Sequence, residues 1–323
     1  MSRSLPMRWS VGALKPSASP SVFRPLLGIA LSQIGHHYLL SAHPHRQIRG
    51  IHNSRRPDHS KQQPFRRSQS RTAPDAVLES LRRQEFKRKV VVWSFWAING
   101  LVFFAWIAAK AEAEHNIEEI KSQPRWQRAT QLELTMISPK MKEMLEKWTS
   151  SRHNLEGGRY YTLLTAAVSH QDFFHLLFNM VTFNAFMTVA LYSSIPLRTL
   201  AGLTVGSAVV GNLSGLADHE RKGQVSHYGL GASTINMGLA SAMACTQPFV
   251  TFAFFGVVPM KLWQLAIGFT ALDMYMLDSK TSSTGHAAHL GGAVFGLVFY
   301  FARLRKFGGL VDIIRYYATR SRK

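Results

Sequence analysis

Six apolar segments most constrain what this chain can fold into. They cover residues 90–109, 173–192, 195–216, 228–244, 262–277 and 286–302. A helix of about 20 apolar residues crosses a hydrocarbon core, and lipid offers no hydrogen-bond partner to unpaired backbone groups. The sequence therefore predicts an all-α polytopic membrane protein with six transmembrane helices. A soluble bundle of fully buried helices is the alternative.

The N-terminal region has the composition of a targeting segment. No Asp or Glu occurs before Asp58, whereas arginine and serine are frequent. Basic, serine-rich and acid-poor segments are typical of mitochondrial presequences. We therefore predict a presequence over residues 1–52 and a basic, disordered linker over residues 53–89. A secretory signal is the competing interpretation, but the apolar stretch 26–40 lies far from the N-terminus between basic residues.

The net charge of +20 lies mainly towards the two ends of the chain. Because positive charge flanks the apolar segments, it fits targeting and membrane orientation, and no nucleic-acid partner is expected. The positive-inside rule then assigns both ends to the matrix and residues 110–160 to the intermembrane space. Glu, Lys and Trp recur in this connection at helical spacing, which predicts amphipathic helices on the membrane surface. The single cysteine, Cys245, excludes an intramolecular disulfide.

Polar residues inside or beside the apolar segments are candidate functional residues, because such groups are costly in lipid. His175 and Asn179 are four residues apart, so they share one face of the second segment, and His170 lies just before it. Ser233 follows Gly231, whose lack of a side chain permits close backbone approach. These residues predict a polar site at one end of the helices.

The fourth and sixth apolar segments each carry a face of small residues. Such faces let two helices pack at short separation, a contact that would bring Ser233 against His289. His286 lies one turn before His289 on the same segment. The small residues are Gly238 and Ala242 on the fourth segment, and Gly292 and Gly296 on the sixth.

The residue types near this contact are suited to serine hydrolysis. A serine hydroxyl is a weak nucleophile until a neighbouring imidazole takes its proton. Hydrolysis of a peptide bond also needs donors for the developing oxyanion. We therefore predict Ser233 as nucleophile and His289 as base. The His175 and Asn179 side chains and the Ser233 backbone N–H are suitable donors.

Together these motifs resemble those of the rhomboid family of intramembrane serine proteases. The matching strings are His170-x4-His175-x3-Asn179, Gly231-Ala232-Ser233 and His289-x2-Gly292-x3-Gly296, in the order and spacing of the family. Residues 286–292 and 99–103 are similar to the mitochondrial presenilin-associated rhomboid-like branch. The resemblance covers roughly residues 90–302.

The resemblance implies a six-helix rhomboid-like membrane domain, placed at residues 90–306, with a basic C-terminal tail over residues 307–323. It implies cleavage of single-span transmembrane proteins in or near their membrane helix, within the lipid bilayer. The mitochondrial branch implies the inner membrane as the location. The family uses no metal or organic cofactor, so none is expected.

The resemblance also implies roles for individual residues. Ser233 and His289 would form a catalytic dyad without a third acid. His175 and Asn179 would help to form the oxyanion hole. Further supporting residues would be His170, Gly231 and His286.

Thr234 departs from the family pattern, which has Gly after the nucleophile. Its branched side chain would crowd the oxyanion site or be absorbed by local repacking. The Trp–Arg pair common in bacterial first loops is also absent, with residues 158–162 near that place. The first alternative is therefore a rhomboid-like pseudoprotease that binds transmembrane helices without cutting them.

The second alternative is a metal or proton carrier built on histidines. Such sites usually recruit carboxylates or cysteines as well. Asp172, Asp273 and Asp278 are available, although Asp273 would equally cap a helix or pair locally. The histidines concerned are His170, His175, His286 and His289.

Overall fold

The computed structural model describes residues 73–121, 138–224, 227–254, 257–279, 282 and 284–321. The predicted presequence and the first part of the predicted linker lie outside these residues. Contacts divide the chain into two units. One unit includes Lys87–Lys323, and the other, Ala18–Phe86, is described only from residue 73.

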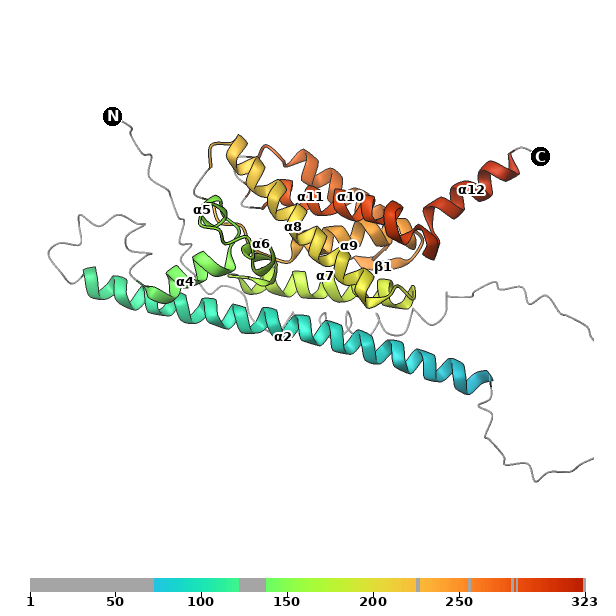
Figure 1. Cartoon of the computed structure of the whole chain (residues 1–323), viewed down its shortest axis with the longest axis horizontal. Coiled ribbons are helices and arrows are strands. Elements are labelled where there is room, and N and C mark those ends of the chain that lie inside the picture. Colours follow the sequence, from blue (N-terminus) through green and yellow to red (C-terminus); the bar gives the residue numbers. More distant parts are fainter. Residues whose placement is uncertain are drawn as a thin grey trace, which may run out of the picture. The chain divides into compact units, whose positions relative to one another are not determined.

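Helices make up most of the described chain (Figure 1). In order, they are α2 (Ala73–Lys121), α4 (Pro139–Trp148), α5 (Arg152–Glu156), α6 (Thr162–Thr165), α7 (Phe173–Tyr192), α8 (Leu197–Arg221), α9 (Ser233–Thr246), α10 (Leu262–Tyr275), α11 (His286–Phe299) and α12 (Leu310–Arg320). Single turns of 3-10 or π helix cover Ala166–Val168, Tyr300–Leu304 and Arg305–Phe307. An antiparallel hairpin of β1 (Thr251–Phe254) and β2 (Val258–Lys261) joins α9 to α10, with Thr251 opposite Lys261. This hairpin was not predicted from the sequence.

Four helices of the described chain are long and apolar enough to cross a membrane. They cover Val77–Glu118, Phe173–Tyr192, Leu197–Arg221 and His286–Phe307. The prediction of an all-α polytopic membrane fold is confirmed. Helices α9 and α10 have 14 residues each, so each is only about 21 Å long. Each predicted span coincides with a helix, but the count of six spans stays a prediction.

Two predicted boundaries differ from the structure. The linker was predicted to extend to residue 89, but helix α2 begins at Ala73, with Asp75 in its first turn at the positive end of the helix dipole. The fourth span was predicted from residue 228, but residues 228–232 form an extended loop ahead of α9. The basic C-terminal tail contains helix α12, whose start is held by the buried Tyr300 hydroxyl.

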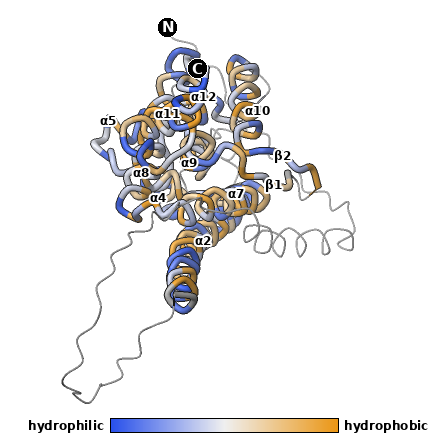
Figure 2. Tube along the Cα trace, turned by 90° about the vertical axis from the view of Figure 1, so that its right-hand side faces the viewer, coloured by the Kyte–Doolittle hydropathy of each residue, from blue (hydrophilic) through white to orange (hydrophobic). Residues whose placement is uncertain are grey.

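Helix α9 forms the centre of the bundle. Eleven of its 14 residues are buried, and it contacts α7, α8, α10 and α11. Figure 2 shows apolar residues along α7 and α10, two of the helices around it. The start of α9 is therefore enclosed by the ends of several helices.

Helices α8, α9 and α11 approach closely at glycines. A Cβ on Gly296 would lie less than 3.0 Å from the carbonyl oxygen of Gly238, and one on Gly292 would lie equally near that of Thr234. A Cβ on Gly238 would overlap the Ser207 side chain of α8. Because backbone atoms cannot rotate away, these positions of α11 have room only for glycine.

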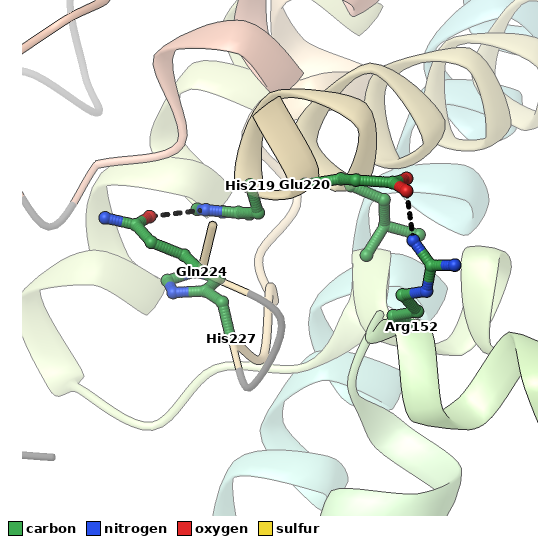
Figure 3. Close-up of a pocket in the computed structure, with 6 residues that line it drawn as sticks. Arg152, His219, Glu220, Gln224 and His227 are labelled. Carbon is green, nitrogen blue, oxygen red and sulfur yellow. Dashed lines mark hydrogen bonds and ion pairs between the residues drawn. The ribbon is translucent and has the colours of Figure 1, made fainter. Parts of the chain in front are cut away.

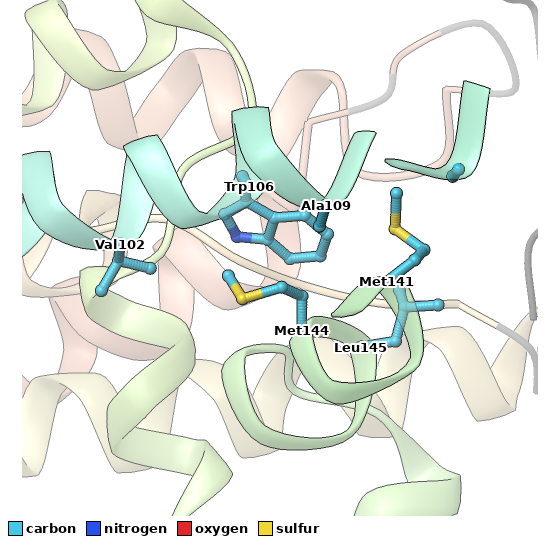
Figure 4. Close-up of a cluster of buried hydrophobic side chains, with 7 residues drawn as sticks. Val102, Trp106, Ala109, Met141, Met144 and Leu145 are labelled. Atoms are coloured by element: carbon cyan, nitrogen blue, oxygen red, sulfur yellow. The ribbon is translucent and has the colours of Figure 1, made fainter. Parts of the chain in front are cut away.

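The connection between α2 and α7 contains the amphipathic helix α4, which packs on α2. Figure 4 shows its apolar side chains around the fully buried Trp106. Ser138 caps α4 by accepting the Met141 backbone N–H, and its own hydroxyl donates to Glu112 of α2. The helices predicted in this connection therefore include one held against the membrane domain. The cluster consists of Val102, Trp106, Ala109, Ala113, Met141, Met144 and Leu145.

Candidate active site

A short loop before α9 fixes the position of Ser233. Gly229 exchanges two backbone hydrogen bonds of 2.8 Å with Ser150, and the Gly231 N–H donates to the Ala166 carbonyl at 2.9 Å. Gly231 has φ 121°, a conformation that residues with a side chain rarely adopt. Ser233 follows as the first residue of α9 and is half-buried.

His170 binds the loop from the side of α7. Its Nε2 accepts the Ala232 backbone N–H at 3.3 Å, which requires the ring proton to be on Nδ1. The ring is fully buried, and burial, aided by the charge of His175, lowers the pKa of His170 to about 3. The neighbouring Ser169 hydroxyl accepts the Trp106 indole N–H at 2.7 Å, which ties this segment to α2. His170 is thus a neutral support for the serine loop.

The His175 ring lies directly against Gly231. A Cβ on Gly231 would come within 2.7 Å of Cε1 and 3.0 Å of Nε2 of the ring. Asp172 caps α7 by accepting the His175 backbone N–H at 2.8 Å, which fixes the start of the helix. The structure therefore brings the His175 imidazole next to the loop that carries Ser233.

Asn179 joins α7 to α9. Its Nδ2 donates to the His175 carbonyl at 2.9 Å, while Asn236 of α9 donates to its Oδ1 at 2.9 Å and to its backbone carbonyl at 3.0 Å. One of the two Asn179 amide protons is thus engaged within its own helix. Sequence reasoning missed Asn236, although a polar residue one turn after Ser233 in an apolar segment was a usable signal.

His289 is paired with a buried carboxylate. Its Nδ1–H donates to Asp273 of α10, at 3.0 Å from Oδ1 and 3.2 Å from Oδ2. His286 Nδ1 donates to the same Oδ1 at 2.7 Å, and its Nε2 lies 2.8 Å from the Ser282 hydroxyl. The Asp273 side chain is 8% exposed, and the His289 side chain is 18% exposed. The resemblance implied no third acid, whereas this geometry provides one.

The starts of α9 and α11 lie side by side. Thr234, next to Ser233, has its backbone against Gly292, which is one turn after His289. His289 is also near enough to His175 for their charges to interact. In the described part of the chain, no hydrogen bond joins the Ser233 hydroxyl to His289. In enzymes without substrate, catalytic hydrogen bonds are often long and tighten only in the complex.

The Thr234 side chain occupies a space that α8 leaves open. Its Cβ and Cγ2 both lie 2.7 Å from where a Cβ on Gly211 would be, and the residue is 2% exposed. The branched side chain is therefore absorbed between α8 and α11. Gly211 has no side chain and so leaves room for the Thr234 methyl group, while the Thr234 hydroxyl is buried without a hydrogen-bond partner in the described residues.

A separate small pocket lies at the end of α8, and Figure 3 shows the side chains that line it. His219 Nδ1 lies 2.9 Å from Gln224 Oε1, and the His219 ring stacks on His227 with centroids 3.6 Å apart. Burial, aided by the charge of His219, lowers the pKa of His227 to about 4. Arg152 and Glu220 form an ion pair at its rim. None of the predicted site residues lines this pocket.

Comparison with known proteins agrees with the resemblance. Residues 157–306 match the family model of the Rhomboid domain, a range that includes every predicted site residue. The chain is also 27% identical over 176 residues to the Arabidopsis thaliana protein named RHOMBOID-like protein 12, mitochondrial. That alignment covers 50% of this chain and 52% of the relative, so the chain spans about half the length of the relative that it matches.

Proposed function

We propose that this chain, which belongs to the rhomboid family, is an intramembrane serine protease of the mitochondrial inner membrane. It would hydrolyse peptide bonds in or near the transmembrane helices of single-span proteins. The observation that carries the proposal is the pairing of His289 Nδ1 with buried Asp273, at a helix start beside that of Ser233. The mitochondrial assignment rests on the presequence-like N-terminus and on the name of the relative.

In the proposed mechanism, Ser233 Oγ attacks the scissile carbonyl carbon and His289 Nε2 accepts the hydroxyl proton. Because Nδ1–H donates to Asp273, Nε2 is the free acceptor of the neutral ring. The carbonyl oxygen gains negative charge, for which the first N–H groups of α9 and the His175 ring are candidate donors. His289 then gives its proton to the leaving amine, and water hydrolyses the acyl ester on Ser233.

Asp273→Asn is expected to lower kcat by about 10²- to 10⁴-fold, with a smaller effect on KM. An amide presents either an N–H or a carbonyl to His289 and no longer selects the tautomer with a free Nε2. The measurement is cleavage of a single-span substrate in liposomes by purified protein. Asp278→Asn, which removes an exposed carboxylate paired with Arg221, is the control. Equal rates for both variants would remove Asp273 from the mechanism.

A fluorophosphonate probe tests the nucleophile without any knowledge of the natural substrate. We expect the wild-type protein to be labelled covalently in detergent and the Ser233→Ala variant to lose the label, because phosphonylation needs an activated serine. Thr234→Gly should keep the label. Mass spectrometry of the labelled peptide identifies the modified residue.

The pseudoprotease remains the alternative, and one observation favours it. The Ser233 hydroxyl has no hydrogen bond to His289 in the described residues, so the nucleophile is not engaged by its base in this conformation. Absence of labelling of the wild-type protein would favour this function over proteolysis. Labelling confined to Ser233 would exclude it.

A further inference from the structure

We infer that Asp273, His286 and His289 form a binding site for a divalent transition-metal ion such as Zn²⁺, and that the ion inhibits the protease. The inhibition rests on the proposed function, whereas the binding site does not. Each of the three residues offers one ligand atom, and these atoms lie within 4.8 Å of one another, where α10 ends and α11 begins. Two imidazoles and a carboxylate are a common ligand set for zinc, with the fourth position left for water.

The three ligands need little movement to receive an ion. The Asp273 Oδ1 atom is 2.7 Å from His286 Nδ1 and 3.0 Å from His289 Nδ1. Ligands 2.0–2.1 Å from a tetrahedral zinc ion are about 3.3 Å apart, so a separation of roughly half an ångström suffices. Ser282, at 2.8 Å from His286 Nε2, orients that ring from behind, as outer partners of zinc ligands do.

The site is electrostatically suited to a cation. Asp273 is a carboxylate surrounded by two rings, and its side chain is only 8% exposed, so water screens it weakly. The ring of His286 is 10% exposed and that of His289 18% exposed, which leaves an approach from the outside. In the described part of the chain, no other group of three His, Cys, Asp or Glu side chains has this arrangement.

The geometry differs from the four-histidine carrier considered from the sequence. His170 Nε2 accepts a backbone N–H, and the His175 ring faces Gly231. Neither ring belongs to the cluster around Asp273. The site therefore has the ligands for one bound ion and gives no reason to infer transport.

Metal binding would block the base through a change of tautomer. An ion on Nδ1 of His289 takes that atom's lone pair, so the single proton of the neutral ring moves from Nδ1 to Nε2. An Nε2–H cannot accept the proton of Ser233. The ring of His286 changes in the same way, and its Nε2–H then donates to Ser282. No proton is gained or lost, and removal of the ion restores the free base.

The first test is inhibition of the full-length protein in liposomes. We expect ZnCl₂ to reduce substrate cleavage at least about tenfold, with full recovery on adding EDTA. The Zn²⁺ concentration that halves the rate, relative to each protein's own metal-free rate, should be at least about tenfold higher for His286→Ala than for the wild type. The reason is that one of three ligands is lost. His227→Ala serves as the control for zinc binding at the other histidine pair. Unchanged zinc sensitivity in His286→Ala would overturn the proposal.

The second test measures binding without activity. Ser233→Ala protein, which retains all three ligands, should bind one Co²⁺ per chain with the visible absorption of a low-coordinate site. The double variant Ser233→Ala/His286→Ala should lose that absorption. Absence of the signal in Ser233→Ala would reject the site. If the metal-free wild type does not cleave any substrate, the proposed function fails, and this binding test alone decides the site.

Discussion

Ser233→Ala and His289→Ala are each expected to abolish cleavage of a co-reconstituted single-span substrate. Loss of either group removes the nucleophile or the base that activates it, and we expect a fall of at least about 10³-fold. The double variant should be no slower than either single one, because the two residues act as a unit. The measurement is the initial rate of product formation in liposomes, with the amount of folded protein matched by gel filtration.

The controls are a serine and a histidine outside the site. Ser321→Ala, directly after α12, and His153→Ala in α5 should both retain wild-type rates, since both residues are exposed. Cleavage at the wild-type rate by Ser233→Ala or His289→Ala would exclude the proposed catalytic dyad without contradicting the fold. Loss of cleavage in the controls as well would point to the assay or to folding.

The residues of the candidate site could be identified from the sequence because polar groups stand out in apolar segments. His175, Asn179, Ser233 and His289 lie on helices whose apolar composition is itself a strong signal. Their order along the chain resembles that of a known family, and the proposed roles come from that resemblance. The helices themselves followed from the need to satisfy backbone groups in lipid.

The partners of those residues could not be predicted, because they depend on how distant helices meet. Asp273 was considered as a carboxylate of a histidine-based carrier or as a residue that would cap a helix or pair locally, yet its carboxylate lies on His289, 16 positions away. Gly211 carried no distinguishing mark among the small residues of its segment, and Asn236 stood out only as a polar residue one turn after Ser233. Each becomes meaningful only once α9 is set between α7, α8 and α11.

Helix ends were also poorly predicted, for two different reasons. Helix α2 continues well beyond the apolar segment because its charged ends are good helix formers, with pairs such as Arg83 and Glu79 at 2.5 Å. Helix α9 starts later than its apolar segment because the backbone of Gly229 is committed to Ser150. Hydropathy therefore predicts which segments are apolar, whereas the local hydrogen bonds determine the residue at which each helix begins.

Gly296→Ala is expected to disrupt the membrane domain although it adds a single methyl group. The new Cβ would meet the Gly238 carbonyl at less than 3.0 Å, and a backbone atom of a central helix cannot move aside alone. Overpacking of this kind costs about 3 kcal/mol or more when no side chain can yield. We expect lower yield of monodisperse protein and a lower midpoint in thermal aggregation assays in detergent.

Gly268→Ala is the matched control, since it makes the same change within α10. A Cβ on Gly268 meets no atom within 4 Å, so the substitution gains helix propensity without a clash. It should leave stability unchanged or raise it by about 0.5–1 kcal/mol. Equal midpoints for the two variants would mean that α9 and α11 do not pack through these glycines. The packing of α9 on α11 would then not place Ser233 beside His289. The two glycine variants therefore test the helix packing on which the proposed mechanism depends.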